Sequence, residues 1–312
     1  MNNPDICVAQ PAPARAFPWL AWAGLLTAVL CWSGNALVAR AFHEAIPPFA
    51  LAFWRWSLAL VILLPLAGVN VWRHRAAFRR AGWRLLVLAL FAITSFNTLL
   101  YLAAQSTEAI NISLLNTCLP LVAFIGTGVL LGEWPARRAW LGLLVAAVGL
   151  LYLISQGSWA RLASLQFFAG DLIMLLAISL WALYTVLLRR WHGYLEMPTL
   201  ALLCVLIALG LPFLLPLYLL ELARTGGFET SPANLGAIAY TAVFASLLAY
   251  LGWNRGVRAV GAAKASMTNY LMPLFTAILG WMLLEESLQA FHWIGGGFIL
   301  LGLLLTSKLA GR

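Results

Sequence analysis

The chain has 312 residues, of which 63% are hydrophobic and 9% are charged, and it carries a formal net charge of +9 at pH 7. Soluble domains contain about 25% charged residues, because a wetted surface has to cover their core. This composition excludes an ordinary soluble protein and predicts an all-α polytopic membrane protein whose outer surface contacts lipid.

The chain begins with residues 1–18, which hold Pro, Ala and Asn but no apolar stretch. We expect a flexible cytoplasmic tail there, without a cleavable signal peptide. Ten apolar stretches follow, each of about 20 residues and therefore long enough to cross the hydrocarbon core. The ten predicted transmembrane helices are 19–42, 48–70, 83–105, 107–131, 136–156, 167–190, 198–221, 233–254, 260–284 and 288–308.

The basic residues are distributed unevenly over the expected loops. With a cytoplasmic N-terminus, 15 of the 19 Lys and Arg residues lie on the cytoplasmic side and three lie on the other side. Positive loops stay in the cytoplasm, so both termini are predicted to be cytoplasmic. The positive charge is therefore interpreted as a topology signal and a contact with anionic membrane lipid, and not as a nucleic-acid site.

The second half of the sequence repeats the first. A shift of 153 residues aligns four pairs without a gap: Asn116 with Asn269, Pro120 with Pro273, Glu133 with Glu286, and Gly149 with Gly302. The halves, 19–156 and 167–309, contain five expected spans each. Because five is odd, the second half must enter the membrane from the opposite side. We predict two inverted five-helix repeats, which are typical of secondary transporters that work by alternating access. Duplication for stability alone is the alternative.

Both halves carry the same motif before a Gly-rich last span. The pattern P-x4-I-x4-LL-x-E runs from Pro120 to Glu133 and again from Pro273 to Glu286. These ordered motifs resemble the drug/metabolite transporter superfamily and, more narrowly, its EamA-type members. The chain as a whole resembles the YddG-type amino acid exporters over nearly its full length. The resemblance implies ten helices, alternating access and export of small metabolites from a bacterium, most of all neutral and aromatic amino acids. Helical spans place such a protein in the inner membrane.

Polar and aromatic side chains near the middle of several spans predict a central substrate cavity, because polar groups at that depth usually face the bundle interior. The candidate substrate-binding residues are Trp32, Asn35, Asn97, Tyr101, Ser113, Asn116, Trp181, Tyr184, Tyr250, Ser266 and Asn269. Aromatic walls suit an aromatic or aliphatic side chain, and amides suit carboxylate and ammonium groups. The alternative is that these residues only pack or tie helices together. Pro120 and Pro273 are expected to kink their helices or free a backbone carbonyl.

Two charged residues are candidates for coupling or gating. Arg55 lies within a span, about seven residues or roughly 10 Å from its outer end. We expect its head to snorkel to the surface; the alternative is that it draws an anionic group, such as a substrate carboxylate, towards the cavity. No acidic residue is expected at mid-depth, which leaves facilitated diffusion open. Glu108, at the outer start of a span, is the candidate proton carrier if transport is coupled.

Other classes of function have weaker support. We expect no cofactor, metal site or enzyme activity, because the four His residues are scattered over loops and the Cys residues lack metal or redox spacing. An integral membrane enzyme is therefore the alternative of another class. A channel lacks a filter-like sequence. A multidrug or organic-cation exporter is the nearest competitor, and it would favour a buried carboxylate.

Overall fold

The computed structural model describes residues 19–42, 44–104, 106–107, 112, 115–116, 118–164, 166, 168–284 and 288–307. Within these residues the chain is helical and has no strand. Seven helical segments there are long and apolar enough to cross a membrane. They are Trp19–Ala39, Pro48–Arg73, Trp83–Leu100, Arg137–Ile154, Ala169–Arg190, Thr199–Thr225 and Pro232–Val260. The protein is therefore a multi-pass membrane protein.

The first half of the chain, up to α9, contains α1 (Trp19–Ala41), α2 (Pro48–Arg73), α3 (Arg75–Ala81), α4 (Trp83–Ala89), η1 (Leu90–Ser95), α5 (Phe96–Ala104), α7 (Leu119–Leu131), α8 (Arg137–Ile154) and α9 (Trp159–Ala163). The second half contains α10 (Ala169–Arg190), η2 (His192–Tyr194), α11 (Thr199–Thr225), α12 (Pro232–Tyr240), η3 (Thr241–Leu248), α13 (Ala249–Val260), α14 (Ala262–Met267), η4 (Thr268–Leu271), α15 (Met272–Leu284) and α16 (Ala290–Ser307).

The helix boundaries follow the predicted spans closely where the chain is described. The span predicted at 107–131 is described continuously only from Cys118 onwards, and α7 and α16 are apolar but shorter than a full span. The span predicted at 260–284 is divided into α14, the 3₁₀ turn η4 and α15. The count of ten transmembrane helices therefore stays a prediction. The predicted tail at 1–18 lies outside the described residues.

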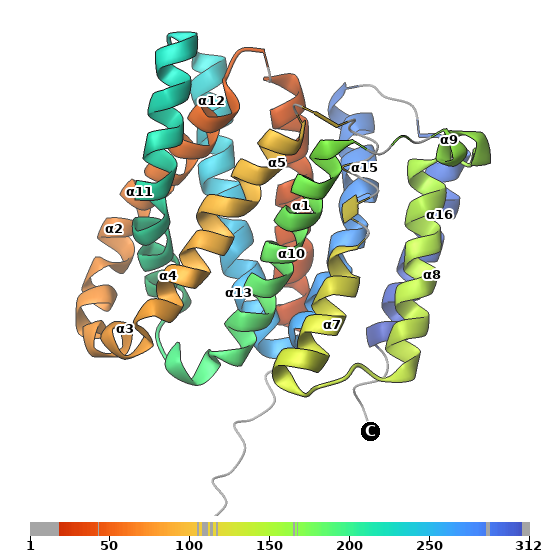
Figure 1. The fold of residues 1–312 in the computed structure, drawn as a ribbon, viewed down its shortest axis with the longest axis horizontal. Coiled ribbons are helices and arrows are strands. Elements are labelled where there is room, and N and C mark those ends of the chain that lie inside the picture. The colour runs from red at the N-terminus through yellow and green to blue at the C-terminus, as the bar shows by residue number, and fades with distance from the viewer. Residues whose placement is uncertain are drawn as a thin grey trace, which may run out of the picture.

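The helices of the two halves interleave (Figure 1). The central helix α1 packs against α13 and α15 of the second half, and α10 packs against α5 and α7 of the first half. The remaining pairs, α2 with α11 and α8 with α16, also join the halves. The beginning of α1 and the end of α16 lie at the same end of the bundle, and the short helix α9 lies at the opposite end.

A carboxylate from one half caps a helix of the other. Helix α2 begins at Pro48, which fits the first helical turn because that turn has no acceptor for its N–H groups. Two of these free groups, the backbone N–H of Phe49 and of Ala50, donate to Glu221 of α11 at 3.1 and 2.7 Å. An acidic group at a helix N-terminus is stabilising, so this contact fixes α2 against α11.

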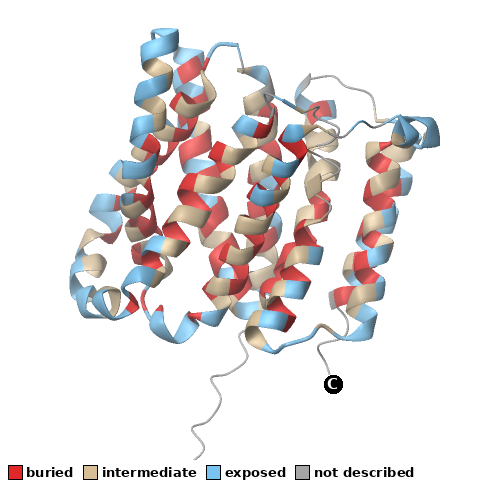
Figure 2. Cartoon of the chain, viewed as in Figure 1, coloured by how far each residue is buried: buried red, intermediate tan, exposed pale blue. Residues whose placement is uncertain are grey.

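The outward faces of the helices are exposed and their inward faces are buried (Figure 2). Large apolar side chains are among the exposed residues, and many small residues are among the buried ones. Val61 of α2 is 63% exposed and Leu144 of α8 is 62% exposed. By contrast, Ala59, Ala92 and Ala177 are fully buried. In water such an exterior would aggregate, whereas lipid solvates it, and small residues at the contacts let helices approach closely.

Helices α8 and α16 approach each other closely through glycines. A Cβ atom added to Gly302 would lie 2.5 Å from the backbone oxygen of Gly142, and one added to Gly149 would lie 2.6 Å from that of Gly295. Neighbouring Gly297, on the same helix α16, has nothing within 4 Å of its added Cβ. The glycines at the contact are therefore required by packing, whereas Gly297 is not.

We predict that Gly302→Ala destabilises the protein by about 1–3 kcal/mol, because the added methyl group overpacks a backbone contact. Thermal unfolding in detergent micelles measures the loss. Gly297→Ala is the matched control and should be neutral or slightly stabilising, since Ala is the better helix former. Equal melting temperatures for the two variants would contradict this account of the interface.

Candidate functional site

A cavity of about 1170 Å³ lies between the two central helices, α1 and α10. Small-molecule sites commonly measure about 300–1,000 Å³, so this cavity can hold a metabolite together with water. Its lining includes Gln156 and Arg161, both of which are exposed at the end of the bundle that carries α9. The cavity therefore opens towards that end.

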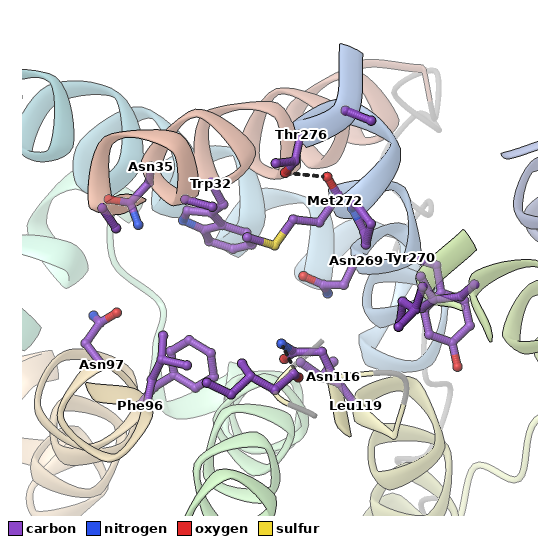
Figure 3. Close-up of a pocket in the computed structure, with 18 of the residues that line it drawn as sticks. Trp32, Asn35, Phe96, Asn97, Asn116, Leu119, Asn269, Tyr270, Met272 and Thr276 are labelled. Carbon is purple, nitrogen blue, oxygen red and sulfur yellow. Dashed lines mark hydrogen bonds between the residues drawn. The ribbon is translucent and has the colours of Figure 1, made fainter. Parts of the chain in front are cut away.

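Carboxamides face one another across the cavity (Figure 3). Asn35 of α1 and Asn269 of η4 lie on one wall, and Asn97 of α5 and Asn116 lie on the opposite wall. The indole of Trp32 projects between the two asparagines of its wall. Because the helices interleave, each wall contains segments from both halves of the chain.

The four carboxamides differ in their hydrogen bonds. The side-chain Nδ2 of Asn116 donates to the carbonyl of Ile112, and that of Asn269 donates to the carbonyl of Ser266, both at 3.1 Å. Their amide oxygens remain available as acceptors. Asn35 and Asn97 make no side-chain hydrogen bond within the described part of the chain, although Asn97 is only 7% exposed. A buried polar group without a hydrogen-bond partner destabilises the protein, so we expect these two amides to hydrogen-bond to a ligand or to water.

An aromatic cluster forms the inner end of the cavity. Trp32 and Trp181, which occupy equivalent places in the two halves, meet edge to face with ring centroids 5.4 Å apart. Tyr250 lies 5.9 Å from Trp32 and 5.6 Å from Trp181, and Phe96 lies 5.4 Å from Trp181. Edge-to-face pairs at these distances are favourable, so the cluster gives the cavity a firm apolar base.

Two π-helical segments, η1 and η3, provide backbone acceptors beside this cluster. The carbonyl of Ala92 in η1 accepts a hydrogen bond from the hydroxyl of Tyr250 at 2.8 Å. The carbonyl of Ala245 in η3 accepts from the indole Nε1 of Trp32 at 3.0 Å. A π-helical turn interrupts the regular helix ladder, and such turns are frequent at functional sites. Each of these bonds joins one half of the chain to the other.

Arg55 of α2 lines the cavity and is only 2% exposed. Its Nε donates to the hydroxyl of Ser246 at 2.9 Å, and its Nη2 donates to the carbonyl of Ala245 at 3.3 Å. The guanidinium also lies 5.1 Å from the ring centroid of Trp56. The expectation that this head snorkels to the surface is wrong, because η3 supplies acceptors inside the bundle.

The opposite end of the bundle is closed by contacts between α1, α10 and α13. The backbones of Gly24 and Gly252 touch, since a Cβ atom added to Gly252 would lie 2.4 Å from the oxygen of Gly24. Beside this contact the hydroxyl of Tyr184 donates to Oδ1 of Asn254 at 2.6 Å. Further along, Nη1 of Arg189 donates to the carbonyl of Arg258 at 3.1 Å.

The structure separates the candidate substrate-binding residues into three groups. Those that line the cavity are Trp32, Asn35, Asn97, Asn116, Trp181, Tyr250 and Asn269. Tyr184 and Ser266 are fully buried and do not line it, since Tyr184 bonds to Asn254 and Ser266 bonds to the carbonyl of Ala263. The expectation that these two contact substrate is not met in this conformation. Ser113, Glu108 and the side chain of Tyr101 lie outside the described residues.

Both prolines lie in the first turn of a described helix. Pro120 is in the first turn of α7, and Pro273 is the second residue of α15, directly after the 3₁₀ turn η4. At Pro273 the expected kink takes the form of a change of helix type. Pro273 also lines the cavity, together with Met272 before it and Thr276 after it.

Several cavity residues were not anticipated from the sequence. They include Phe96, Leu119, Tyr270, Met272, Thr276, Arg161 and His292. Phe96 and Tyr270 are direct neighbours of the predicted Asn97 and Asn269, but an adjacent position points about 100° away on a regular helix. Phe96 is the first residue of α5, directly after the π-helix η1, and Tyr270 lies in the 3₁₀ turn η4, so both stand beside or within an irregular turn. Arg161 and His292 lie at helix ends, where periodicity carries no information.

Comparison with known proteins gives consistent matches over most of the chain. The model of the EamA-like transporter family matches residues 18–155 and 168–308. An uncharacterized transporter of Archaeoglobus fulgidus is 31% identical over 289 residues, which cover 91% of this chain and 96% of that protein. Uncharacterized transporter YyaM of Bacillus subtilis is 29% identical over 273 residues, covering 83% and 84%. A solved crystal structure is similar in fold alone, with a TM-score of 0.75, 18% identity and coverage of 93% and 97%.

We predict that Tyr184→Phe destabilises the closed end by about 1–3 kcal/mol, because it leaves a buried amide without its partner. Asn254 is fully buried, and its Nδ2 already lacks an acceptor within the described structure. Unfolding in detergent measures the change. The matched control is Tyr218→Phe, which removes a 3.3 Å bond from Trp54 at an exposed position. A loss of equal size in the control would show that burial does not decide the effect.

Proposed function

Because this chain belongs to the EamA-like transporter family, we propose that it exports small metabolites, neutral and aromatic amino acids in particular, by alternating access. We place it in the inner membrane of a bacterium, with both termini in the cytoplasm. The observation that carries the proposal is the cavity itself, which combines an aromatic base with two carboxamides, Asn35 and Asn97, that have no hydrogen-bond partner within the described residues. A transporter of this class takes a small-molecule substrate and needs no covalent chemistry.

The proposed inverted repeat is supported by features that recur at the same shift. Adding 153 to the bounds of η1, residues 90–95, gives 243–248, which lies within η3. Regular helices rarely contain π segments, so the coincidence favours duplication of one structural unit. Equivalent helices also run in opposite directions, since α1 rises from the end of the bundle where α10 finishes (Figure 1).

Alternating access is supported by the unequal ends of the cavity. One end is open beside Gln156 and Arg161, whereas the other is closed by the backbone contact of Gly24 with Gly252. With the predicted topology, the open end faces outwards and the closed end faces the cytoplasm. Two similar halves of opposite orientation can exchange their conformations, which would open the cytoplasmic end and close the outer one.

The amino acid assignment is supported by the chemistry of the lining. Trp32, Trp181 and Phe96 offer apolar surfaces to a side chain, and the amides of Asn35 and Asn97 offer both donors and acceptors to a zwitterionic backbone. An organic-cation exporter would be expected to hold a carboxylate near the cation. No Asp or Glu is present among the described residues that line the cavity.

Uptake of labelled phenylalanine and leucine into proteoliposomes tests the function. We expect uptake without an imposed pH gradient, accelerated by unlabelled amino acid on the far side, because the described cavity holds no carboxylate to carry a proton. Uptake only with a gradient would assign coupling to a group outside the described residues, with Glu108 as the first candidate. Absence of uptake for a panel of amino acids would refute the assignment.

Asn97→Ala gives a sharper test, because within the described residues the side chain of Asn97 makes no hydrogen bond that the substitution could break. The variant should raise the apparent KM for phenylalanine about tenfold, as expected for the loss of one or two buried hydrogen bonds to substrate. Its melting temperature should stay close to that of the wild type. Asn70→Ala, towards the far end of α2 and away from the cavity lining, is the matched control and should leave the KM unchanged.

We further predict that Gly252→Ala opens the closed end, because the added methyl group would lie 2.4 Å from a backbone oxygen of α1. The readout is the rate at which a membrane-impermeant maleimide labels Leu25→Cys in a background without native cysteines. Leu25 is fully buried at this end, and labelling should accelerate several-fold. Gly236→Ala, whose added Cβ has nothing within 4 Å, should not change the rate. An unchanged rate in both variants would mean that this contact does not gate the cavity.

A further inference from the structure

The environment of Arg55 is unusual for a charge within a membrane protein. Its side chain is 98% buried, and within the described residues no carboxylate lies within ion-pair distance of it. Leaving a buried charge without a counter-ion costs several kcal/mol. Such a charge persists where the function requires it, and intramembrane ionisable residues commonly mark substrate or ion pathways.

Only part of the guanidinium is occupied by protein acceptors. An arginine has five N–H donors, and here Nε and Nη2 each donate to one acceptor, Ser246 and Ala245 respectively. The bond from Nη2 is long, at 3.3 Å, and Nη1 has no acceptor within the described part of the chain. Because Arg55 lines the cavity, its guanidinium has donors left over for a ligand there.

The charged side chains among the described residues that line the cavity have one sign. Arg55 lies within it, Arg161 lies at its open end, and no Asp or Glu is among the described lining residues. Glu221 of the neighbouring helix α11 is occupied by the N-terminus of α2, where it accepts from Phe49 and Ala50. The described lining is therefore positive from its mouth to Arg55, which attracts anions and repels cations.

We infer that Arg55 binds the carboxylate of the transported substrate, so that the carrier selects molecules that carry a carboxylate and rejects amines that lack one. This inference rests on the proposed transport function and specifies its substrate class. A carboxylate matches the arginine fork, because two parallel N–H···O bonds from Nη1 and Nη2 can hold both of its oxygens. With the carboxylate bound, Nε can still donate to the hydroxyl of Ser246, and the guanidinium can keep its cation–π contact with the ring of Trp56.

The same geometry connects substrate binding to the contact between the halves. The carbonyl of Ala245 accepts from both Arg55 and Trp32, so a carboxylate that draws Nη2 away leaves this carbonyl to the indole alone. The change occurs at η3, in the half of the chain that does not contain Arg55. Binding at Arg55 therefore changes a hydrogen bond between the two halves. Alternating access requires these halves to move relative to each other.

The test measures binding to the purified full-length carrier in detergent, with four probes that separate the functional groups. L-phenylalanine has both the carboxylate and the amine, 3-phenylpropionate has only the carboxylate, phenethylamine has only the amine, and phenylalaninamide has the amine without the carboxylate. Ligand-dependent thermal stabilisation gives an apparent Kd for each. We expect the first two probes to bind the wild type at least about tenfold more tightly than the last two, as for a charge-assisted bidentate pair.

Arg55→Gln should lose this preference and weaken the two carboxylate probes at least about tenfold. The matched control is Arg224→Gln, which removes the same charge from an exposed position of α11 outside the cavity lining. It should change the apparent Kd less than about threefold, because exposed charges are screened. Equal affinities in the wild type and Arg55→Gln, or equal losses in both variants, would overturn the inference. Tight binding of phenethylamine with none of phenylpropionate would overturn it as well.

Two further outcomes can be interpreted even if the Arg55→Gln variant does not fold, or if the protein does not transport amino acids. If Arg55→Gln does not give monodisperse protein, the wild type alone decides, since failure to distinguish phenylalanine from phenylalaninamide refutes the inference. Binding of phenylpropionate without binding or uptake of phenylalanine would support Arg55 as a carboxylate site and refute the amino acid function. The two proposals therefore fail separately.

Discussion

Two backbone carbonyls, those of Ala92 and Ala245, hold the centre of this protein together. A bilayer offers no water to a freed peptide group, so every carbonyl that leaves the helix ladder must find a partner inside the protein. In η1 and η3 that partner is a side chain from the other half of the chain, the hydroxyl of Tyr250 or the indole of Trp32. These bonds place the aromatic cluster, and the cluster forms the base of the cavity.

The two acceptors occupy equivalent positions in the two halves, but their donors do not. At the position equivalent to Asn97 the second half has Tyr250, so one repeat presents an amide to the cavity and the other sends a phenol to Ala92. Similarly, Ala245 accepts a second bond from Arg55, whereas within the described residues no arginine donates to the equivalent Ala92. A twofold cavity would bind a molecule in two orientations. These substitutions remove that ambiguity, and they place the positive group on one side only.

The sequence predicted those features that depend on regular helix and on repetition. The long apolar runs defined α1, α2, α10 and α11, and the shift of 153 residues identified Asn116 and Asn269 as a pair before their carboxamides were seen to face each other. Residues beside irregular turns were harder to predict. Tyr184 was expected in the cavity because it is equivalent to Asn35, but a longer aromatic side chain reaches Asn254 instead. Arg55 was expected to snorkel because sequence alone cannot show that η3 offers acceptors at the same depth.

The proposed carboxylate site has a consequence for the other end of the substrate. A zwitterion held at Arg55 brings an ammonium group into a cavity whose described lining has no acidic residue. Amide oxygens such as that of Asn116 and the faces of Trp32 and Trp181 are the available partners, and each is weaker than an ion pair. The carboxylate would then be recognised strictly, whereas the ammonium and the side chain would be held loosely. Such an unequal distribution of binding energy would suit an exporter of several related metabolites. One strong contact would fix the orientation of the substrate, and many weak contacts would allow its side chain to vary.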